Sequence, residues 1–261
     1  DRFTLITAAS AQWHDFDVLN NALPEFLNLE DNTKEFSTLI VTGPKSRDVL
    51  TAMGTNADLS LSWLSHQSAT LAGQTCELIR VSFAGELGWE IHADNAKIPS
   101  LYNAVISAGA KPFGMHALNS LRIEKGYRAW KGDLSTDYSL LEGGLGRFVK
   151  LDKAEVFPGK AALQNEKQQG SKKVFVTLIL ETGLFDAPYM STIWHNGVVV
   201  GETTSGAFGY RVNKSIALGV LRTDLAVAGT EVEVEIFGQR YAANVQEDQP
   251  LWDADNSRLR A

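Results

Sequence analysis

The chain has 261 residues, enough to bury one large hydrophobic core or two smaller ones, and its 44% hydrophobic and 21% charged residues are typical of a globular protein. A formal net charge of -7, without any cluster of lysine and arginine, argues against a nucleic-acid partner. No apolar run approaches the roughly 20 residues needed to cross a bilayer, which argues against a membrane partner.

Cysteine and histidine usage limits the chemistry further. The single Cys76 allows no internal disulfide, and no signal-peptide pattern opens the chain. Both features fit a reducing compartment, such as the cytoplasm or, in a eukaryote, the mitochondrial matrix. The five histidines lack metal-ligand spacing, so no metal site is expected.

The chain begins at Asp1 without a methionine, and residues 3–8 read as a strand almost at once. This start predicts a piece of a longer protein. It also predicts that the first strand is an incomplete sheet edge, left unpaired or covered by another copy of the chain. A helix is predicted over about 11–22, with the apolar residues Trp13, Phe16, Leu19 and Leu23 at helical spacing.

A second strand is predicted over 37–42. Gly43 and Pro44 then open a helix, because proline suits a first helical turn. Its buried face is predicted to be Val49, Leu50 and Met53.

The most informative stretch runs from Arg80 to His92. A strand is predicted over 76–83, and the chain extends again from Trp89. Between them, Gly85 and Gly88 allow a tight turn in which the backbone can approach a ligand closely. Alternation places Glu90 on the opposite face from Trp89 and Ile91. A carboxylate there could accept two parallel hydrogen bonds from an amidine-like edge such as a pterin. Read alone, the stretch is more typical of a bulged hairpin whose glutamates are solvated.

Two helices are predicted next, over 96–108 and about 115–125. In the second, Leu118 and Leu121 are expected to face inward, and the charged residues of its last turn to form an outer face: Arg122, Glu124 and Lys125. The long glycine-rich loop over 127–148 indicates a functional segment, because idle loops of this length are uncommon in compact domains.

Residues 164–173 are polar and are predicted to form a linker. Beyond it only strands are predicted, over 174–180, 191–195, 198–203, 215–220, 231–236 and 239–245. Asn196-Gly197 supplies the positive φ angles of a type I′ hairpin turn. The fold class is therefore α+β, with a domain over 1–170 followed by a small antiparallel β-barrel over 171–261.

Phe83-x-Gly85-Glu86-x-Gly88-Trp89-Glu90 resembles a signature of the aminomethyltransferase (glycine-cleavage T-protein) family. The stretches Leu121–Arg128 and Pro250–Arg260 are similar to the folate-binding C-terminal half of dimethylglycine and sarcosine dehydrogenases. The resemblance covers nearly the whole chain. It implies a T-protein-like folate-binding domain whose N-terminal part is missing, followed by the barrel.

The resemblance also implies the site residues. Glu90 would hold the pterin of tetrahydrofolate, in a cleft walled by Phe83, Ile91, His92 and Arg147. Phe83 stands where the family has tyrosine, and Arg147 where it has an aromatic residue that packs on folate. Arginine can stack on a planar ring through its guanidinium.

Two departures from the family pattern limit these expectations. Leu118 stands where the family has an arginine for the glutamyl tail of folate. The family's catalytic aspartate lies upstream of the first predicted strand, so no catalytic residue can be assigned here. There is also no Gly-x-Gly-x-x-Gly motif for the flavin (FAD) of the dehydrogenases, which would belong to a missing domain.

The expected function is the tetrahydrofolate-binding portion of a one-carbon-transfer enzyme, which captures a one-carbon unit from an N-methyl amine such as dimethylglycine or sarcosine. The alternative is a non-catalytic folate-binding or assembly module. The expected partners are the folate itself and a flavin-binding domain or subunit. Fold alone does not decide between these readings, because one scaffold hosts several functions.

Overall fold

The computed structural model describes residues 2–183 and 185–261. The chain divides into two compact units, each with its own hydrophobic core. The first contains the residues up to Ser82, together with Glu86–Pro112 and Arg258–Ala261. The second contains Phe83–Gly85 and Phe113–Ser257. Helices and sheets occur together, which confirms the α+β class. The predicted domain boundary near residue 170 lies inside the second unit and stays a prediction.

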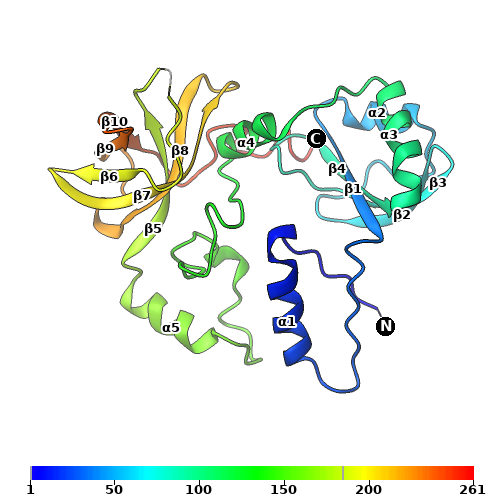
Figure 1. Ribbon diagram of the computed structural model, residues 1–261, viewed down its shortest axis with the longest axis horizontal. Coiled ribbons are helices and arrows are strands. Elements are labelled where there is room, and N and C mark those ends of the chain that lie inside the picture. The colour runs from blue at the N-terminus through cyan, green and yellow to red at the C-terminus, as the bar shows by residue number, and fades with distance from the viewer. Residues whose placement is uncertain (1, 184) are drawn as a thin grey trace. The chain divides into compact units, whose positions relative to one another are not determined.

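The first unit is built on a four-stranded antiparallel sheet in the order β1-β4-β3-β2 (Figure 1). Its strands are β1 (Phe36–Thr42), β2 (His66–Leu71), β3 (Gln74–Ile79) and β4 (Gly88–Asp94). Helices α2 (Ser46–Ala52) and α3 (Ile98–Ser107) cover one face, the latter preceded by a 3-10 turn over Asn95–Lys97. The predicted buried residues Val49, Leu50 and Met53 all lie in this core. The opposite face of the sheet carries mostly polar side chains, as Thr38, Glu77, Glu90 and His92 show.

The prediction of a strand over 76–83 extends too far, because β3 ends at Ile79. Arg80 still bonds across to Ser65 and Leu64, and beyond it no residue up to Leu87 belongs to a strand. Residues 80–87 therefore form an irregular loop before β4, although their apolar residues continue the strand-like pattern.

The strand predicted over 3–8 is wrong. These residues belong to no sheet, and Phe3 is 87% exposed. The prediction that this strand is an incomplete sheet edge falls with it, since alternation in the sequence cannot form a strand without a pairing partner. A 3-10 turn (Ala9–Ala11) and helix α1 (Gln12–Ala22) follow, which confirms the predicted helix. None of the residues of α1 is buried, so its apolar spacing does not build a core here.

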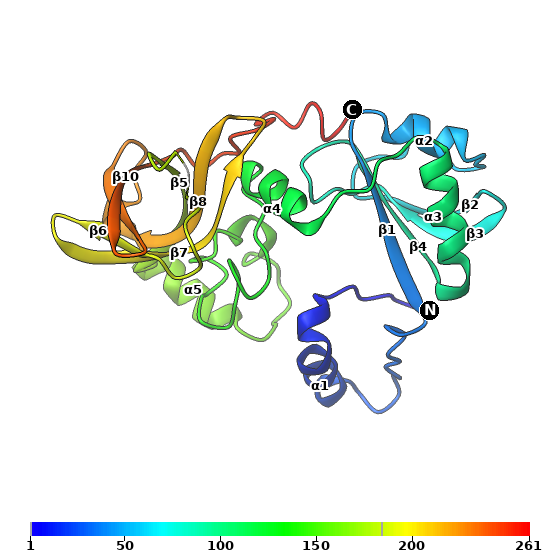
Figure 2. The ribbon, with the colours of Figure 1, turned by 45° about the horizontal axis from the view of Figure 1, so that its top comes forward.

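The second unit contains a closed barrel in the order β10-β5-β8-β7-β6-β9, with every neighbouring pair antiparallel (Figure 2). Its strands are β5 (Lys173–Leu180), β6 (Thr192–His195), β7 (Val198–Gly209), β8 (Lys214–Arg222), β9 (Glu231–Ile236) and β10 (Gln239–Val245). Asn196 and Gly197 join β6 to β7 with φ angles of 51° and 76°, which confirms the predicted hairpin turn. The only helical turn between β5 and β10 among the described residues is the 3-10 turn Thr223–Leu225.

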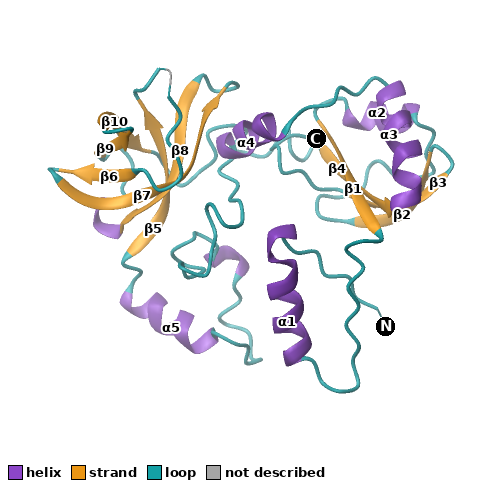
Figure 3. Ribbon diagram, in the orientation of Figure 1, coloured by secondary structure: helices purple, strands orange, loops and turns teal. Residues whose placement is uncertain are grey.

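Two helices precede the barrel in the second unit (Figure 3). Helix α4 (Met115–Glu124) packs Ile123 against the barrel residues Ala207, Ile216 and Leu218. A 3-10 turn over Gly146–Phe148 and helix α5 (Lys160–Gln169) follow.

The predicted linker over 164–173 is wrong, because most of it belongs to α5. This segment consists mainly of lysine, alanine, glutamine and glutamate, which are good helix formers even without an apolar face. Gly159 and Gly170, with φ angles of 84° and 82°, bound the helix at its two ends.

Candidate functional site

Glu90 lies on the polar face of β4, as alternation predicts. Trp89 and Ile91 are fully buried in the core on the other face. The side chains of Glu90 and His92 are 25% and 19% exposed. Ile91 can therefore contribute only backbone atoms to a ligand beside Glu90, because its side chain points into the core.

Three side chains form a hydrogen-bonded series across β1 and β4. The Oγ1 of Thr38 lies 3.0 Å from Nδ1 of His92, and Nε2 of His92 lies 3.0 Å from Oε2 of Glu90. Thr38 and His92 are direct partners in the antiparallel register. Glu90 makes no other hydrogen bond to the described residues, so its Oε1 is available as an acceptor.

The same polar face continues toward β3 and β2. Ser68 donates to Oε1 of Glu77 at 2.5 Å, and Lys97 pairs with Asp94 at 2.5 Å. A hollow of about 470 Å³ lies over this part of the sheet, and His92 is in its wall. The polar face therefore offers carboxylates, a histidine and space beside them within one unit.

The two turn glycines meet protein atoms rather than open space. A Cβ at Gly88 would lie 2.7 Å from the Cβ of Ser82. Gly85 has a φ of 70°, and a Cβ there would lie 2.9 Å from the side chain of Lys125. Both positions need glycine for packing, which is a different reason from the expected close approach of backbone to a ligand.

Phe83 and Arg147 belong to the second unit. The ring of Phe83 stacks on Tyr127 with centroids 5.9 Å apart and an interplanar angle of 11°. Burial raises the pKa of the Tyr127 hydroxyl above its ordinary value. The guanidinium of Arg147 lies 4.8 Å from the centroid of Phe148. Arg147 thus stacks on an aromatic ring of its own loop, and a contact of Phe83 or Arg147 with folate stays a prediction.

The predicted charged outer face of α4 is wrong. Arg122, Glu124 and Lys125 are all buried, and each pairs with a residue of opposite charge. Arg122 pairs with Asp133 at 2.7 Å and Lys125 with Asp253 at 2.9 Å, while Glu124 pairs with Arg211. These pairs fix the long loop and the 252–257 segment to the helix, so this part of the resemblance has a structural role.

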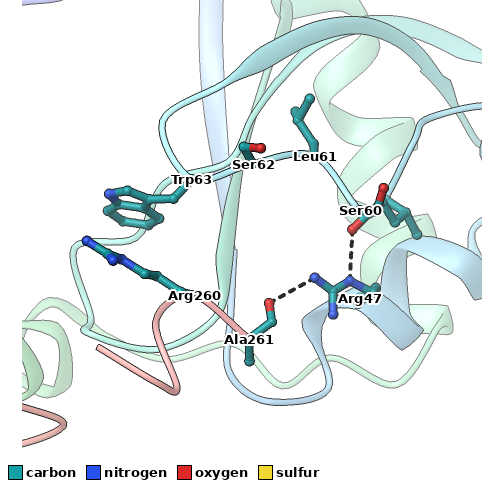
Figure 4. Close-up of a pocket in the computed structure, with 8 residues that line it drawn as sticks. Arg47, Ser60, Leu61, Ser62, Trp63, Arg260 and Ala261 are labelled. Atoms are coloured by element: carbon teal, nitrogen blue, oxygen red, sulfur yellow. Dashed lines mark hydrogen bonds between the residues drawn. The ribbon is translucent and has the colours of Figure 1, made fainter. Parts of the chain in front are cut away.

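A second hollow of the first unit, of about 610 Å³, has a cationic wall that includes Arg47 and Arg260 beside Trp63 (Figure 4). Arg47 donates from Nη2 to the carbonyl oxygen of Ala261 at 2.9 Å. The buried Arg80 donates to the same carbonyl at 2.9 Å. The pKa of Arg80 is lowered, mainly by burial and also by the positive charge of the nearby Arg47. The arginines thus hold residues 259–261, and none of the predicted site residues lines this hollow.

Residues 2–183 and 185–261 contain neither a helix suited to cross a membrane nor a cluster of metal-ligating side chains. No helix there is both long and apolar enough to span a bilayer. No cluster of three or more histidine, cysteine or carboxylate side chains in that part of the chain is placed to hold a metal ion.

Comparisons with known proteins agree along the whole chain. The family described as "GCVT N-terminal domain" matches residues 1–153, and "Glycine cleavage T-protein C-terminal barrel domain" matches residues 173–253. The chain is 37% identical over 269 residues to "Dimethylglycine dehydrogenase, mitochondrial" of Mus musculus, which covers 99% of this chain and 31% of that protein. It is 36% identical over 279 residues to "Sarcosine dehydrogenase, mitochondrial" of Mus musculus, covering 100% of this chain and 30% of that protein.

A solved structure of an aminomethyltransferase has a similar fold. The glycine cleavage system aminomethyltransferase T from Bartonella henselae superposes with a TM-score of 0.83 at 25% identity, over 94% of this chain and 67% of that one. The chain spans less than a third of the length of the two dehydrogenases that it matches. With one family matching more than half of its residues, the chain belongs to the glycine cleavage T-protein (aminomethyltransferase) family.

Proposed function

We propose that the polar face of β4 binds the pterin of tetrahydrofolate through Glu90, and that the chain is the folate-binding portion of a one-carbon-transfer enzyme. The observation that carries this proposal is the Glu90 carboxylate itself. It lies opposite the buried Trp89, is partly exposed, and has one oxygen without a partner among the described residues. Glu90 also lies within the residues that the family model matches.

The chemistry of the carboxylate suits a pterin edge. The pterin N3–H and 2-amino group are parallel donors, and the two oxygens of an ionised carboxylate accept such a pair in a charge-assisted way. Each oxygen has two acceptor positions, so the bond from His92 to Oε2 leaves room for a ligand donor. Bound tetrahydrofolate would supply the acceptor for a one-carbon unit.

The names of two relatives support an N-methyl amine as the source of the one-carbon unit. Two of them are named as dehydrogenases of dimethylglycine and sarcosine, which are N-methyl amines. A flavin-binding domain or subunit would oxidise such an amine, and the unit described here would receive the product. This division of labour is consistent with the share of those proteins that the chain covers.

Calorimetric titration with folinic acid tests the proposal. Glu90→Gln should weaken binding by about 1–3 kcal/mol, because the amide keeps the shape but loses the charge and one acceptor oxygen. Glu86→Gln is the matched control and should have a smaller effect, because residue 86 lies in the 80–87 loop rather than on β4.

The two possible failures have different meanings. A larger loss with Glu86→Gln than with Glu90→Gln would show that the wrong glutamate had been chosen. No binding of folinic acid by the wild-type chain would refute the folate proposal and favour the assembly-module alternative.

A further inference from the structure

His92 is the side chain that connects Glu90 to the neighbouring strand. It projects from the same face of β4 as Glu90, and its ring spans from Thr38 on β1 to the Glu90 carboxylate, with a distance of 3.0 Å at each end. An imidazole fixed at both nitrogens has little rotational freedom, so the position of the Glu90 carboxylate depends on β1 as well as on β4.

The direction of these hydrogen bonds can be assigned from the chemistry of the end groups. An ionised carboxylate can only accept, so Nε2 of His92 must carry a proton and donate it to Glu90. In the neutral ring Nδ1 is then an acceptor, and the hydroxyl of Thr38 donates to it. The series therefore runs from Thr38 through His92 to Glu90 with every donor matched to an acceptor.

A second carboxylate near His92 does not compete for this proton. Glu77 on β3 is the direct register partner of His92 on the other side, but its hydrogen bond is with Ser68 at 2.5 Å, while the two ring nitrogens of His92 lie 3.0 Å from Thr38 and Glu90. Among the described residues, the Nε2–H of His92 thus donates to Glu90 alone.

We infer that His92 is a positioning residue for Glu90. His92 acts on a ligand through the Glu90 carboxylate and does not contact the ligand itself. This inference rests on the proposed function, because it takes Glu90 as the group that binds the pterin. A glutamate has several rotatable bonds, and holding one of its oxygens lowers the entropy lost when the ligand binds. The other oxygen remains free for the ligand.

A double-mutant cycle measured by calorimetric titration with folinic acid separates the two roles. His92→Phe removes both hydrogen bonds and should weaken binding about tenfold. His92→Gln keeps an N–H donor at the reach of Nε2, and should lose no more than about threefold. When Glu90 is already alanine, His92→Phe should cause no further loss, because the group that it positions is gone. An equal loss in both backgrounds would overturn the positioning role and show direct contact with the ligand.

The contact itself can be tested without any ligand. The ¹⁵N chemical shifts of the His92 ring report its tautomer, and the Nε2–H form is expected in the wild-type chain. The Nδ1–H form would place a lone pair against the carboxylate and would overturn the inference. Absence of folinic-acid binding would instead refute the proposed function, while the tautomer would still decide whether His92 holds Glu90.

Discussion

The ion pair between Arg122 and Asp133 provides a direct test of how the second unit is stabilised. Asp133 is fully buried and accepts three hydrogen bonds: from Nη1 of Arg122 at 2.7 Å, from the backbone N–H of Ala129 at 2.8 Å and from Thr204 at 2.5 Å. Asp133→Asn removes the charge with little change in volume and leaves the guanidinium of Arg122 beside a neutral amide.

The expected cost follows from these contacts. In the variant, the partners of the buried Arg122 are the neutral oxygens of Asn119, Tyr127 and Ser205. Breaking a buried ion pair on one side usually costs about 3–5 kcal/mol, because the remaining charge stays desolvated. At roughly 2–4 °C per kcal/mol for a domain of about 150–250 residues, the melting midpoint should fall by about 6–20 °C.

Scanning calorimetry of the wild-type chain and two variants measures this shift. Asp224→Asn is the control, because Asp224 forms an ion pair of similar length, 2.6 Å, with Arg222 but is 61% exposed. Solvent screens such pairs, so the control should melt like the wild-type chain. Equal midpoints for Asp133→Asn and Asp224→Asn would refute the reasoning, since burial is the only difference that it uses.

Three further outcomes are expected. Cys76 should react slowly with a thiol reagent in the folded chain and promptly in guanidinium chloride. The side chain is buried, and burial together with the charge of Glu77 raises the pKa of its thiol. Prompt labelling of the native chain as the pH rises would contradict this. Gly88→Ala should lower the free energy of unfolding by about 1–3 kcal/mol in urea titrations, and adding Ser82→Gly should restore part of it by removing the clashing Cβ. Asn196→Ala should cost about 1 kcal/mol in the same assay while Asn196→Gly is tolerated, because the residue has a φ of 51°; the opposite order would argue against the type I′ turn.

Local pattern alone was enough for several elements. Helix α3 shows apolar residues at helical spacing, and the barrel strands show alternation between clear turn residues. The Asn196-Gly197 turn needs positive φ angles that few other residue pairs adopt readily. In each case the deciding interactions lie within a few residues along the chain, so the sequence carries them openly.

Partners that are distant in the sequence decided the rest. The charged residues of α4 look like a solvated face, but Glu124 meets Arg211 and Lys125 meets Asp253, which lie 87 and 128 positions further along. Conversely, residues 3–8 have the alternation of a strand, yet no other segment of the described chain pairs with them. Whether a charged residue is buried and whether a segment forms a strand both depend on a partner elsewhere in the chain. The periodicity of a segment does not identify that partner.

The candidate site divides in the same way. The sequence by itself determined that Glu90 points away from Trp89, because the side-chain period of a strand is two. Only the tertiary structure decided that His92 holds the carboxylate, since this requires Thr38, 54 positions earlier, to stand opposite His92 in the register of β1 and β4. A register is set by which hydrophobic residues of two strands share one core face, and that choice is made by the folded sheet as a whole.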